Sequence, residues 1–329
     1  MSTFTYSETS SVSSACLAVL QLSHIKGLGL KNYHLLNDCF MSAEKVIDSS
    51  YEELLVSGVK PKLARLIADQ NVQLDEAYQS FYNRLMAWTN KQGNYLVCLE
   101  DDLYPSRLKE IYCPPPLLYL QGNLKAFDYD SISVVGSRKP TLMGQKHAAM
   151  FSRQLAEMGY CITSGLAIGV DSYAHQGALD MGGVTCAVLG SGLESIYPKQ
   201  NQKLAMAIKE RGVLISELSL DVKALPANFP RRNRVIAGLS AGTLVIEAGL
   251  KSGSLITADF AIEQNREVFV VPGPIDNPLS KGGHELIKQG ATLVDEVQDV
   301  VNVVGGKHKM EEISAKTAVS ANVDYSNLT

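Results

Sequence analysis

Short apolar runs alternate with amphipathic segments through most of the second half of the chain. Seven runs are nearly all apolar and predict strands: SISVVG, YCITSG, VTCAVLG, GVLISE, GTLVIEA, EVFVVPG and ATLVDEV. Between them, apolar residues recur at helical spacing in MGQKHAAMFSRQLAEMG, DSYAHQGALDMG, NQKLAMAIKERG and SLITADFAIEQN. Strands that are apolar on both faces and alternate with helices predict a parallel sheet covered on each side. We therefore expect an α/β domain over residues 131–298, with a doubly wound, mostly parallel, Rossmann-like sheet.

The first 90 residues have a different pattern, which predicts a small all-helical domain over 1–90. Apolar residues lie at helical spacing in CLAVLQL, NYHLLNDCF and LARLIADQNVQL. In IKGLGLKNYHLL, Gly27 and Gly29 flank Leu28. The segment VSGVKPKLARLI at 56–67 is a weaker match to the same pattern. This is the form of a helix-hairpin-helix, as in SAM-like domains, whose turn can direct backbone N–H groups at a phosphate. An ordinary packing corner between two helices is the alternative.

Two further segments flank the predicted sheet. Residues 91–130 predict a connector leading into the core, where Pro114–Pro116 exclude a helix and LLYLQG indicates a short strand. Residues 299–329 are short and polar, and we expect a largely disordered tail.

Composition narrows the possible partners. The chain of 329 residues has a formal net charge of −4, so any binding of a polyanion must depend on a local patch. The N-terminus lacks the basic region of a signal peptide, and no apolar run reaches membrane-spanning length, which favours a cytoplasmic protein. The six cysteines form no CxxC pair and the six histidines are scattered. We therefore predict free thiols, no metal site and no cofactor.

A local positive patch is present in NFPRRNRVIAGLSAGTLVIEA, residues 228–248. Three arginines fall within four positions just before an apolar run, and no acidic residue lies between Asp221 and Glu247. Loops after the other predicted strands add Gly136, Ser137, Arg138 and Lys199. Because the carboxyl ends of parallel strands meet at one edge, these cations should converge there, where such folds bind ligands.

Motifs for common enzymatic chemistry are missing from the sequence. The first predicted strand is followed by VVGSRKPTLMG rather than GxGxxG, and neither a P-loop nor a GxSxG elbow occurs. Asp171 and His175 share a predicted helix face, but capping by Asp171 and local packing by His175 explain them better than catalysis. We predict no catalytic residues.

The ordered set of motifs resembles the DNA-processing protein A family (DprA, also called Smf), which acts in natural transformation. The resemblance covers residues 95–298, through VVGSRKPTLMG, ITSGLAIGVDSYAHQGAL, AVLGSGLESIYPKQNQKL, ISELSLDVKALPANFPRRNRVIAGLS and LVIEAGLKSGSLITADFAIEQNREVFVVPGPIDNPLSKGGHELIKQGATLV. IKGLGLKN also resembles the amino-terminal module of that family. Many members carry a winged-helix-like domain after the core, for which the 31 residues of 299–329 are too short.

The resemblance implies a non-enzymatic protein that binds single-stranded DNA without strong sequence preference. It also implies loading of the RecA recombinase, a homodimer formed through the Rossmann-like domain, and single-strand-binding protein as a further candidate partner. Phosphates would be held by a cationic track. Two alternatives are open for Tyr197 and Phe229, which either stack on bases or pack in the core. The implied DNA-binding residues are Gly136, Ser137, Arg138, Ser164, Gly165, Lys199, Phe229, Arg231, Arg232, Asn233 and Arg234.

Two other functions compete with this interpretation. GLSAGTLVIEA weakly resembles the PGGxGTxxE loop of lysine-decarboxylase-like nucleotide phosphoribohydrolases, which would make Glu247 catalytic, although Leu239 and Ser240 replace the leading Pro and Gly. Alternatively, the arginines are structural and pair with Asp221 or Glu217. Surface pairs contribute little to stability, so stability alone is a weak reason to cluster them.

Overall fold

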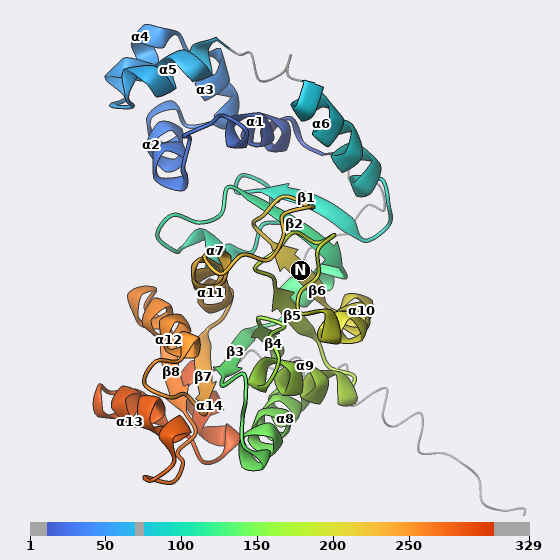
Figure 1. Ribbon diagram of the computed structural model, residues 1–329, viewed down its shortest axis with the longest axis vertical. Coiled ribbons are helices and arrows are strands. Elements are labelled where there is room, and N and C mark those ends of the chain that lie inside the picture. The colour runs from blue at the N-terminus through green and yellow to red at the C-terminus, as the bar shows by residue number, and fades with distance from the viewer. Residues whose placement is uncertain (1–11, 70–75, 306–329) are drawn as a thin grey trace, which may run out of the picture.

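The computed structural model describes residues 12–69 and 76–305. Within these ranges, a group of helices lies at one end of the molecule and a nine-stranded sheet forms the rest (Figure 1). The strands are β1 (Asn94–Cys98), β2 (Leu117–Gly122), β3 (Ser131–Gly136), β4 (Cys161–Ser164), β5 (Thr185–Val188), β6 (Val213–Ser216), β7 (Gly242–Ile246), β8 (Glu267–Val270) and β9 (Thr292–Leu293). All seven strands predicted from apolar runs are present, as β3 to β9.

The strand order is β1-β2-β6-β5-β4-β3-β7-β8-β9, and pairing is parallel from β6 to β9. The chain builds outward from β3 through β4 and β5 to β6, then crosses back to place β7 on the other side of β3. The winding direction therefore reverses between β3 and β7. Such a switch point is where open α/β sheets bind ligands, beyond the carboxyl ends of the strands. The predicted Rossmann-like fold class is confirmed.

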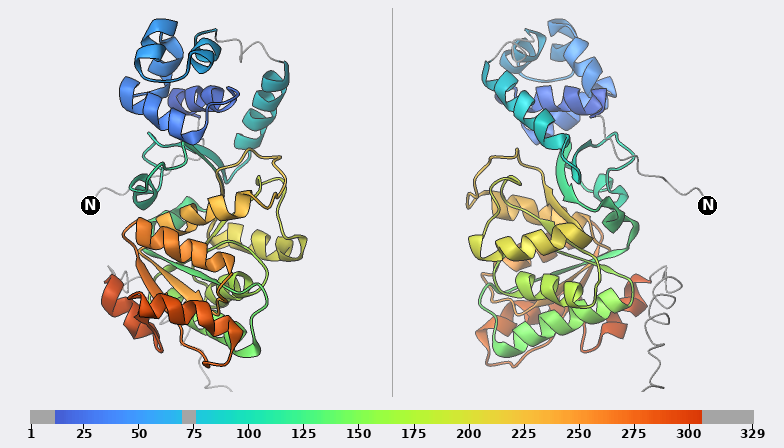
Figure 2. Two further views of the ribbon diagram at one scale, coloured as in Figure 1. Left: turned by 60° about the vertical axis from the view of Figure 1, so that its left-hand side comes forward. Right: turned by 90° about the vertical axis from the view of Figure 1, so that its right-hand side faces the viewer.

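Helices cover both faces of this sheet, as Figure 2 shows. Alternation along β3 explains why: Ile132 and Val134 point to one face and Val135 to the other. The first face packs against α8 (Leu142–Glu157), α9 (Val170–Asp180), α10 (Gln202–Arg211) and α14 (Val297–Val304). The second packs against α7 (Ser106–Lys109), α11 (Asn228–Gly238), α12 (Gly253–Glu263) and α13 (Lys281–Lys288).

The N-terminal helices form as the apolar spacing predicts. They are α1 (Ser14–Ser23), α2 (Leu30–Phe40), α3 (Ala43–Asp48), α4 (Tyr51–Val56), α5 (Pro61–Ala68) and α6 (Glu76–Thr89). Side chains of Ser13, Ser42 and Ser50 cap α1, α3 and α4. Gly27 and Gly58 both have φ of +93° in the turns before α2 and α5, a left-handed conformation that favours glycine.

The predicted connector of 91–130 is part of the sheet. Its strands β1 and β2 are antiparallel to each other, and β2 is antiparallel to β6. Only β2 was predicted from the sequence, as LLYLQG. The sheet therefore extends to within a few residues of α6, and the segment is more ordered than a connector.

The predicted boundary at residue 298 is corrected by α14. This helix runs to Val304, begins with a capping box between Glu296 and Asp299, and buries Val297 and Val300. Disorder from residue 299 is therefore wrong for 299–304, and the rest of the predicted tail, 306–329, lies outside the described residues. Within the described ranges, no helix is long and apolar enough to cross a membrane.

Candidate nucleic-acid interface

A hollow of about 740 Å³ opens at the switch point, between the end of β3, α11 and the beginning of α12. We call it the switch pocket. Its position is the one that the fold predicts for a ligand. Six of the implied DNA-binding residues line it: Gly136, Ser137, Arg138, Phe229, Arg232 and Asn233.

An exposed cation and two aromatic rings meet at the edge of the switch pocket. The Arg138 guanidinium lies over the Phe229 ring, 5.6 Å from its centroid, and the Tyr197 ring centroid is 5.8 Å from that of Phe229. Tyr197 is 52% exposed. A Cβ on Gly190 would approach the Phe229 ring to 2.8 Å, so this glycine makes room for the ring. The group presents a positive charge beside aromatic surface.

Arg232 is a buried cation in the wall of the same pocket. It is 5% exposed, its Nη1 donates to the Val188 carbonyl, and its Nε has no hydrogen-bond partner among the described residues. Burial lowers the pKa of Arg232 to about 10, and this value still leaves the side chain charged at neutral pH. The guanidinium therefore places a positive charge in the wall of the pocket, partly balanced by the carboxylate of Asp171.

Gly165 makes room for this arginine. A Cβ at Gly165 would lie 1.8 Å from the Arg232 Nη1, so no larger residue fits beside the guanidinium. Its backbone N–H donates at 3.0 Å to the Asp171 carboxylate, which also accepts from the Ala167 N–H at 3.3 Å.

Asp171 is the second residue of α9 and its carboxylate stabilises the loop before the helix. The prediction that Asp171 caps the helix is therefore corrected. Burial raises the pKa of Asp171, and the charge of Arg232 opposes this.

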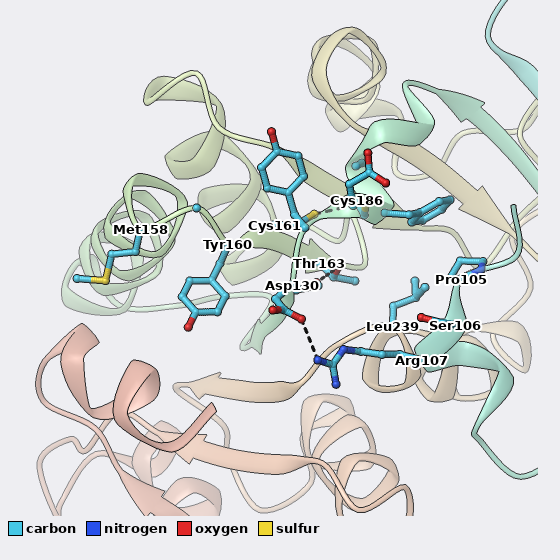
Figure 3. Close-up of a pocket in the computed structure, with 16 residues that line it drawn as sticks. Pro105, Ser106, Arg107, Asp130, Met158, Tyr160, Cys161, Thr163, Cys186 and Leu239 are labelled. Carbon is cyan, nitrogen blue, oxygen red and sulfur yellow. Dashed lines mark hydrogen bonds and ion pairs between the residues drawn. The ribbon is translucent and has the colours of Figure 1, made fainter. Parts of the chain in front are cut away.

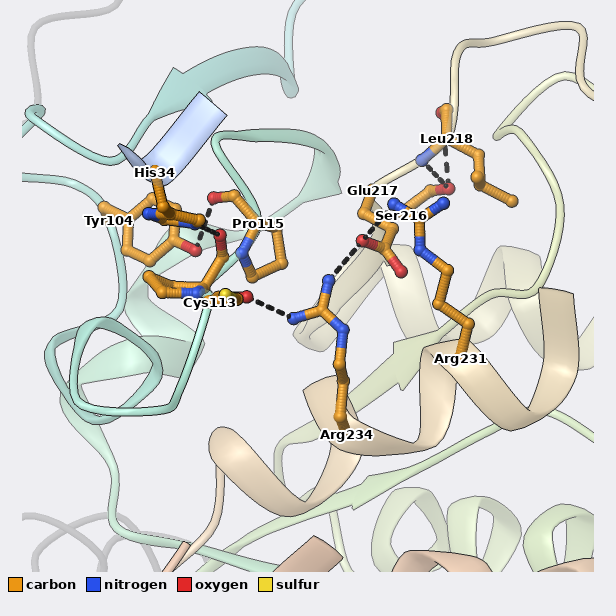
Figure 4. A network of polar contacts seen from close by, with 10 residues as sticks. His34, Tyr104, Cys113, Pro115, Ser216, Glu217, Leu218, Arg231 and Arg234 are labelled. Atoms are coloured by element: carbon orange, nitrogen blue, oxygen red, sulfur yellow. Dashed lines mark hydrogen bonds and ion pairs between the residues drawn. The ribbon is translucent and has the colours of Figure 1, made fainter. Parts of the chain in front are cut away.

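Arg231 and Arg234 do not line the switch pocket. They are three positions apart on α11 and so share a face, from which both reach Glu217 (Figure 4). The Glu217 carboxylate is only 4% exposed, and Arg234 also donates to the Cys113 carbonyl at 2.9 Å. The structural alternative, pairing with Glu217, is confirmed for both arginines. Arg234 is buried, so the prediction that it converges with the other cations at the ligand-binding edge is wrong. Arg231 remains half exposed.

Ser164 is also inaccessible. It is fully buried and its hydroxyl donates to the Val134 carbonyl at 2.6 Å, within the sheet. Gly136 has a packing role as well, because a Cβ there would lie 1.8 Å from the Ile246 carbonyl of the neighbouring β7. Its absence of a side chain is required by the spacing of β3 and β7.

Lys199 and Asn233 complete the implied set. Lys199 is exposed and begins the short helix η3 (Lys199–Asn201), two residues after Tyr197, without itself lining the pocket. Asn233 donates to the Gly253 carbonyl at 3.1 Å and ties α11 to the start of α12. The Ser137 hydroxyl accepts from the Lys139 N–H at 3.0 Å and shapes the turn that carries Arg138.

The sequence interpretation missed the contribution of α12. Lys251, Ser252 and Ser254 line the switch pocket, and Ser252 caps the helix by accepting from the Ser254 N–H. The beginning of a helix carries partial positive charge and favours anions. The available signal was GLKSGS, a loop of Gly, Ser and Lys between a predicted strand and a predicted helix.

Glu247, the candidate catalytic residue of the alternative function, has a structural contact. Its carboxylate accepts from the Thr141 N–H at 2.7 Å and from the Thr141 hydroxyl at 2.5 Å. Thr141 in turn caps α8 through the Gly144 N–H. This arrangement does not favour the phosphoribohydrolase function.

A second hollow, of about 410 Å³, lies at the opposite ends of β3 and β4 (Figure 3). The Arg107 guanidinium in it is paired with Asp130 at 2.8 Å, and Asp128 also lines the hollow. No implied DNA-binding residue does so. Because its cation is neutralised, this hollow is a poorer anion site than the switch pocket.

A doubly wound sheet with a cationic, aromatic-edged pocket at its switch point defines a Rossmann-like protein suited to an anionic ligand. The family model "DNA recombination-mediator protein A" matches residues 95–305. The chain belongs to this family, which confirms the resemblance.

Known relatives agree with this assignment. Protein Smf of Escherichia coli is 46% identical over 225 residues, 68% of this chain and 60% of that protein. The DNA processing protein DprA of Streptococcus pneumoniae is 45% identical over 201 residues, 61% of this chain and 71% of that one. Its X-ray structure matches with a TM-score of 0.75 at 36% identity, covering 86% of this chain and 96% of that one.

A further solved structure concerns the "unique single-stranded DNA binding mode" of DNA processing protein A from Helicobacter pylori. It matches with a TM-score of 0.58 at 31% identity, covering 64% of this chain and 95% of that one. The alignment with Smf of Escherichia coli spans less than two thirds of that relative's length.

Proposed function

We propose that this chain binds single-stranded DNA at the switch pocket. The observation that carries the proposal is the group of Arg138, Phe229 and Tyr197, which sets a cation beside two aromatic rings at the ligand-binding edge of the sheet. Non-specific single-strand binders combine such cations, which hold phosphates, with aromatic rings on which bases stack. The single-stranded DNA named for the Helicobacter pylori relative supports the same ligand.

The residues in and beside the switch pocket have distinct tasks in this proposal. Arg138 and Lys199, both exposed, attract the backbone; Arg232 and the beginning of α12 hold a phosphate in the pocket. Tyr197 and Phe229 stack on bases, which requires bases free of a duplex partner. The preference for single strands thus follows from the aromatic edge, while affinity follows from the cations.

Family membership extends the proposal to partners. We infer that the DNA-bound chain delivers the strand to the RecA recombinase during natural transformation, and that it acts as a homodimer through the Rossmann-like domain. Single-strand-binding protein is a further candidate partner. In this proposal the chain handles DNA without catalysing a reaction on it.

Fluorescence anisotropy with a labelled oligo-dT strand, and with its duplex, over a salt series tests DNA binding. We expect salt-sensitive preference for the single strand. Arg138→Ala and Lys199→Ala should each weaken binding by about tenfold, since a hydrogen bond to a charged group contributes about 1.5 kcal/mol or more. Each should also reduce the slope of log affinity against log salt by about 0.7, the value for one phosphate contact on a single strand.

Arg153→Ala is the charge-matched control, because Arg153 is exposed on α8 and pairs with Asp180. It should leave affinity and slope unchanged. Equal affinity for strand and duplex, or no binding at low salt, would reject the proposed function. If the folded Arg138→Ala variant bound with wild-type affinity, Arg138 would not be part of the DNA interface.

A further inference from the structure

Two cysteines and a carboxylate converge where the helical region meets the sheet. Cys16 on α1, Cys98 at the end of β1 and Asp101 just after it place their ligand atoms within 4.8 Å of one another. The Cys16 thiol lies 3.0 Å from the Asp101 Oδ2, and both cysteines are fully buried. Among the described residues this is the only group of three such side chains. The sequence hid it, because 82 positions separate the two cysteines.

The spacing of these atoms suits a tetrahedral metal ion. With Zn–S bonds of about 2.3 Å and Zn–O bonds of about 2.1 Å, ligand atoms lie about 3.5–3.8 Å apart. The 3.0 Å contact between Cys16 and Asp101 therefore has to open by only a fraction of an ångström. The Leu96 carbonyl oxygen lies 3.6 Å from the Cys16 sulfur, a spacing that two ligands of one ion could have.

Polar contacts around the group orient its ligands. The Ser13 hydroxyl donates to the Asp101 Oδ1 at 3.0 Å, and the Cys98 N–H donates to the Oδ2 at 2.8 Å. The Cys16 N–H donates to the Ser13 hydroxyl at 3.1 Å. Such outer contacts fix ligands and are a regular part of protein metal sites.

We propose that Cys16, Cys98 and Asp101 bind one Zn²⁺, with the Leu96 carbonyl or a water as the fourth ligand. Thiolates with an oxygen donor match the borderline-soft character of this ion. Binding releases the protons of both thiols to solvent. The ion links α1 to β1, and so fastens the helical region to the edge of the sheet.

Metal content of the full-length protein, purified without chelator and supplied with Zn²⁺, tests the site. We expect one Zn²⁺ per chain by mass spectrometry of the metal, and a rise in Tm on adding Zn²⁺. Cys98→Ser and Asp101→Asn should each lower the affinity at least tenfold, the effect of losing a ligand or its orientation. Cys186→Ala is the matched control, since Cys186 is also buried and lies 3.5 Å from another thiol, Cys161.

Substitution with Co²⁺ gives a readout that needs no variant. A thiolate-to-metal charge-transfer band in the folded wild type supports Cys16 and Cys98 as ligands. Absence of that band, or equal Zn²⁺ content in wild type and Cys98→Ser, overturns the proposal. A mass lower by two hydrogens without added reductant, with a Cys16–Cys98 cross-linked peptide, would overturn it too, by identifying a disulfide instead.

Discussion

Arg231, Arg232 and Arg234 are neighbours in the sequence with different environments. Because they lie on a helix, Arg231 and Arg234 turn toward Glu217, while Arg232 turns toward Val188 and the switch pocket. The three arginines are clustered in the sequence, but the folded protein places them in different environments. Part of it holds α11 against neighbouring segments, and part is available to a ligand.

The two arginines that share Glu217 should differ in their effect on stability. Arg234 is 10% exposed, so Arg234→Ala leaves a buried carboxylate poorly compensated and should cost about 3 kcal/mol. Arg231 is 51% exposed and its loss should cost less than about 1 kcal/mol. Urea unfolding of both variants measures the difference. Similar free energies of unfolding would show that Glu217 does not depend on Arg234.

His175 is a buried neutral histidine whose tautomer follows from its contacts. The Thr185 hydroxyl donates its one proton to the Ile162 carbonyl at 2.6 Å, so the 2.7 Å contact with His175 requires a proton on Nδ1. Burial, with a smaller effect from the charge of Arg232, lowers the pKa of His175 to about 3. The predicted packing and local hydrogen bonding of this histidine are confirmed.

This shift predicts a pH dependence of stability. Below pH 6.5 His175 is protonated in the unfolded state but stays neutral in the folded state. The free energy of unfolding is therefore highest above pH 6.5 and falls as the pH drops. Relative to His175→Asn, the wild type should lose up to about 1.4 kcal/mol per pH unit on going down to about pH 5. Urea unfolding at a series of pH values measures this. Parallel curves for the two proteins would contradict a neutral His175.

The sequence predicted where the site residues lie along the chain better than it predicted what each side chain does. The sequence identified Arg138 and Phe229, which the fold brings together because both flank carboxyl ends of the parallel strands. The sequence could not show that Arg232 faces the switch pocket while Arg234 faces Glu217. That difference depends on which side of α11 each arginine occupies and on where Glu217 lies. Gly165 was predicted to bind DNA, and nothing in the sequence indicated the packing role by which it makes room for a guanidinium.

At the scale of elements, burial explains which predictions succeeded. Strands β3 to β8 lie inside a sheet covered on both faces, so their sequences are mostly apolar and easily recognised. Strand β1 lies at the edge of the sheet and was left within the predicted connector, although four of its five residues are buried. The helix α11 was not predicted, because it begins with polar residues and contains Pro230. That proline lies in the first turn, where its missing N–H has no partner to lose.

At the scale of the whole molecule, one apolar cluster crosses the division predicted at residue 90. It contains Leu85 and Trp88 of α6 together with Tyr119 of β2 and Leu214 of β6. Polar contacts cross as well, since Arg84 pairs with Asp221 at 2.8 Å and His34 hydrogen-bonds the Pro114 carbonyl at 2.8 Å. We therefore propose that the predicted domains, although distinct in pattern, are joined into one energetic unit.

The single tryptophan allows this coupling to be measured. Trp88 is 5% exposed at the junction, so its fluorescence reports on the helical region, whereas far-ultraviolet circular dichroism reports on the whole chain. We expect both probes to show one coincident urea transition. Leu214→Ala, a change in the sheet that should cost about 3 kcal/mol, should shift both transitions equally. If fluorescence kept its wild-type midpoint while circular dichroism moved, the helical region would be folding on its own, and the shared apolar cluster would contribute little to its stability.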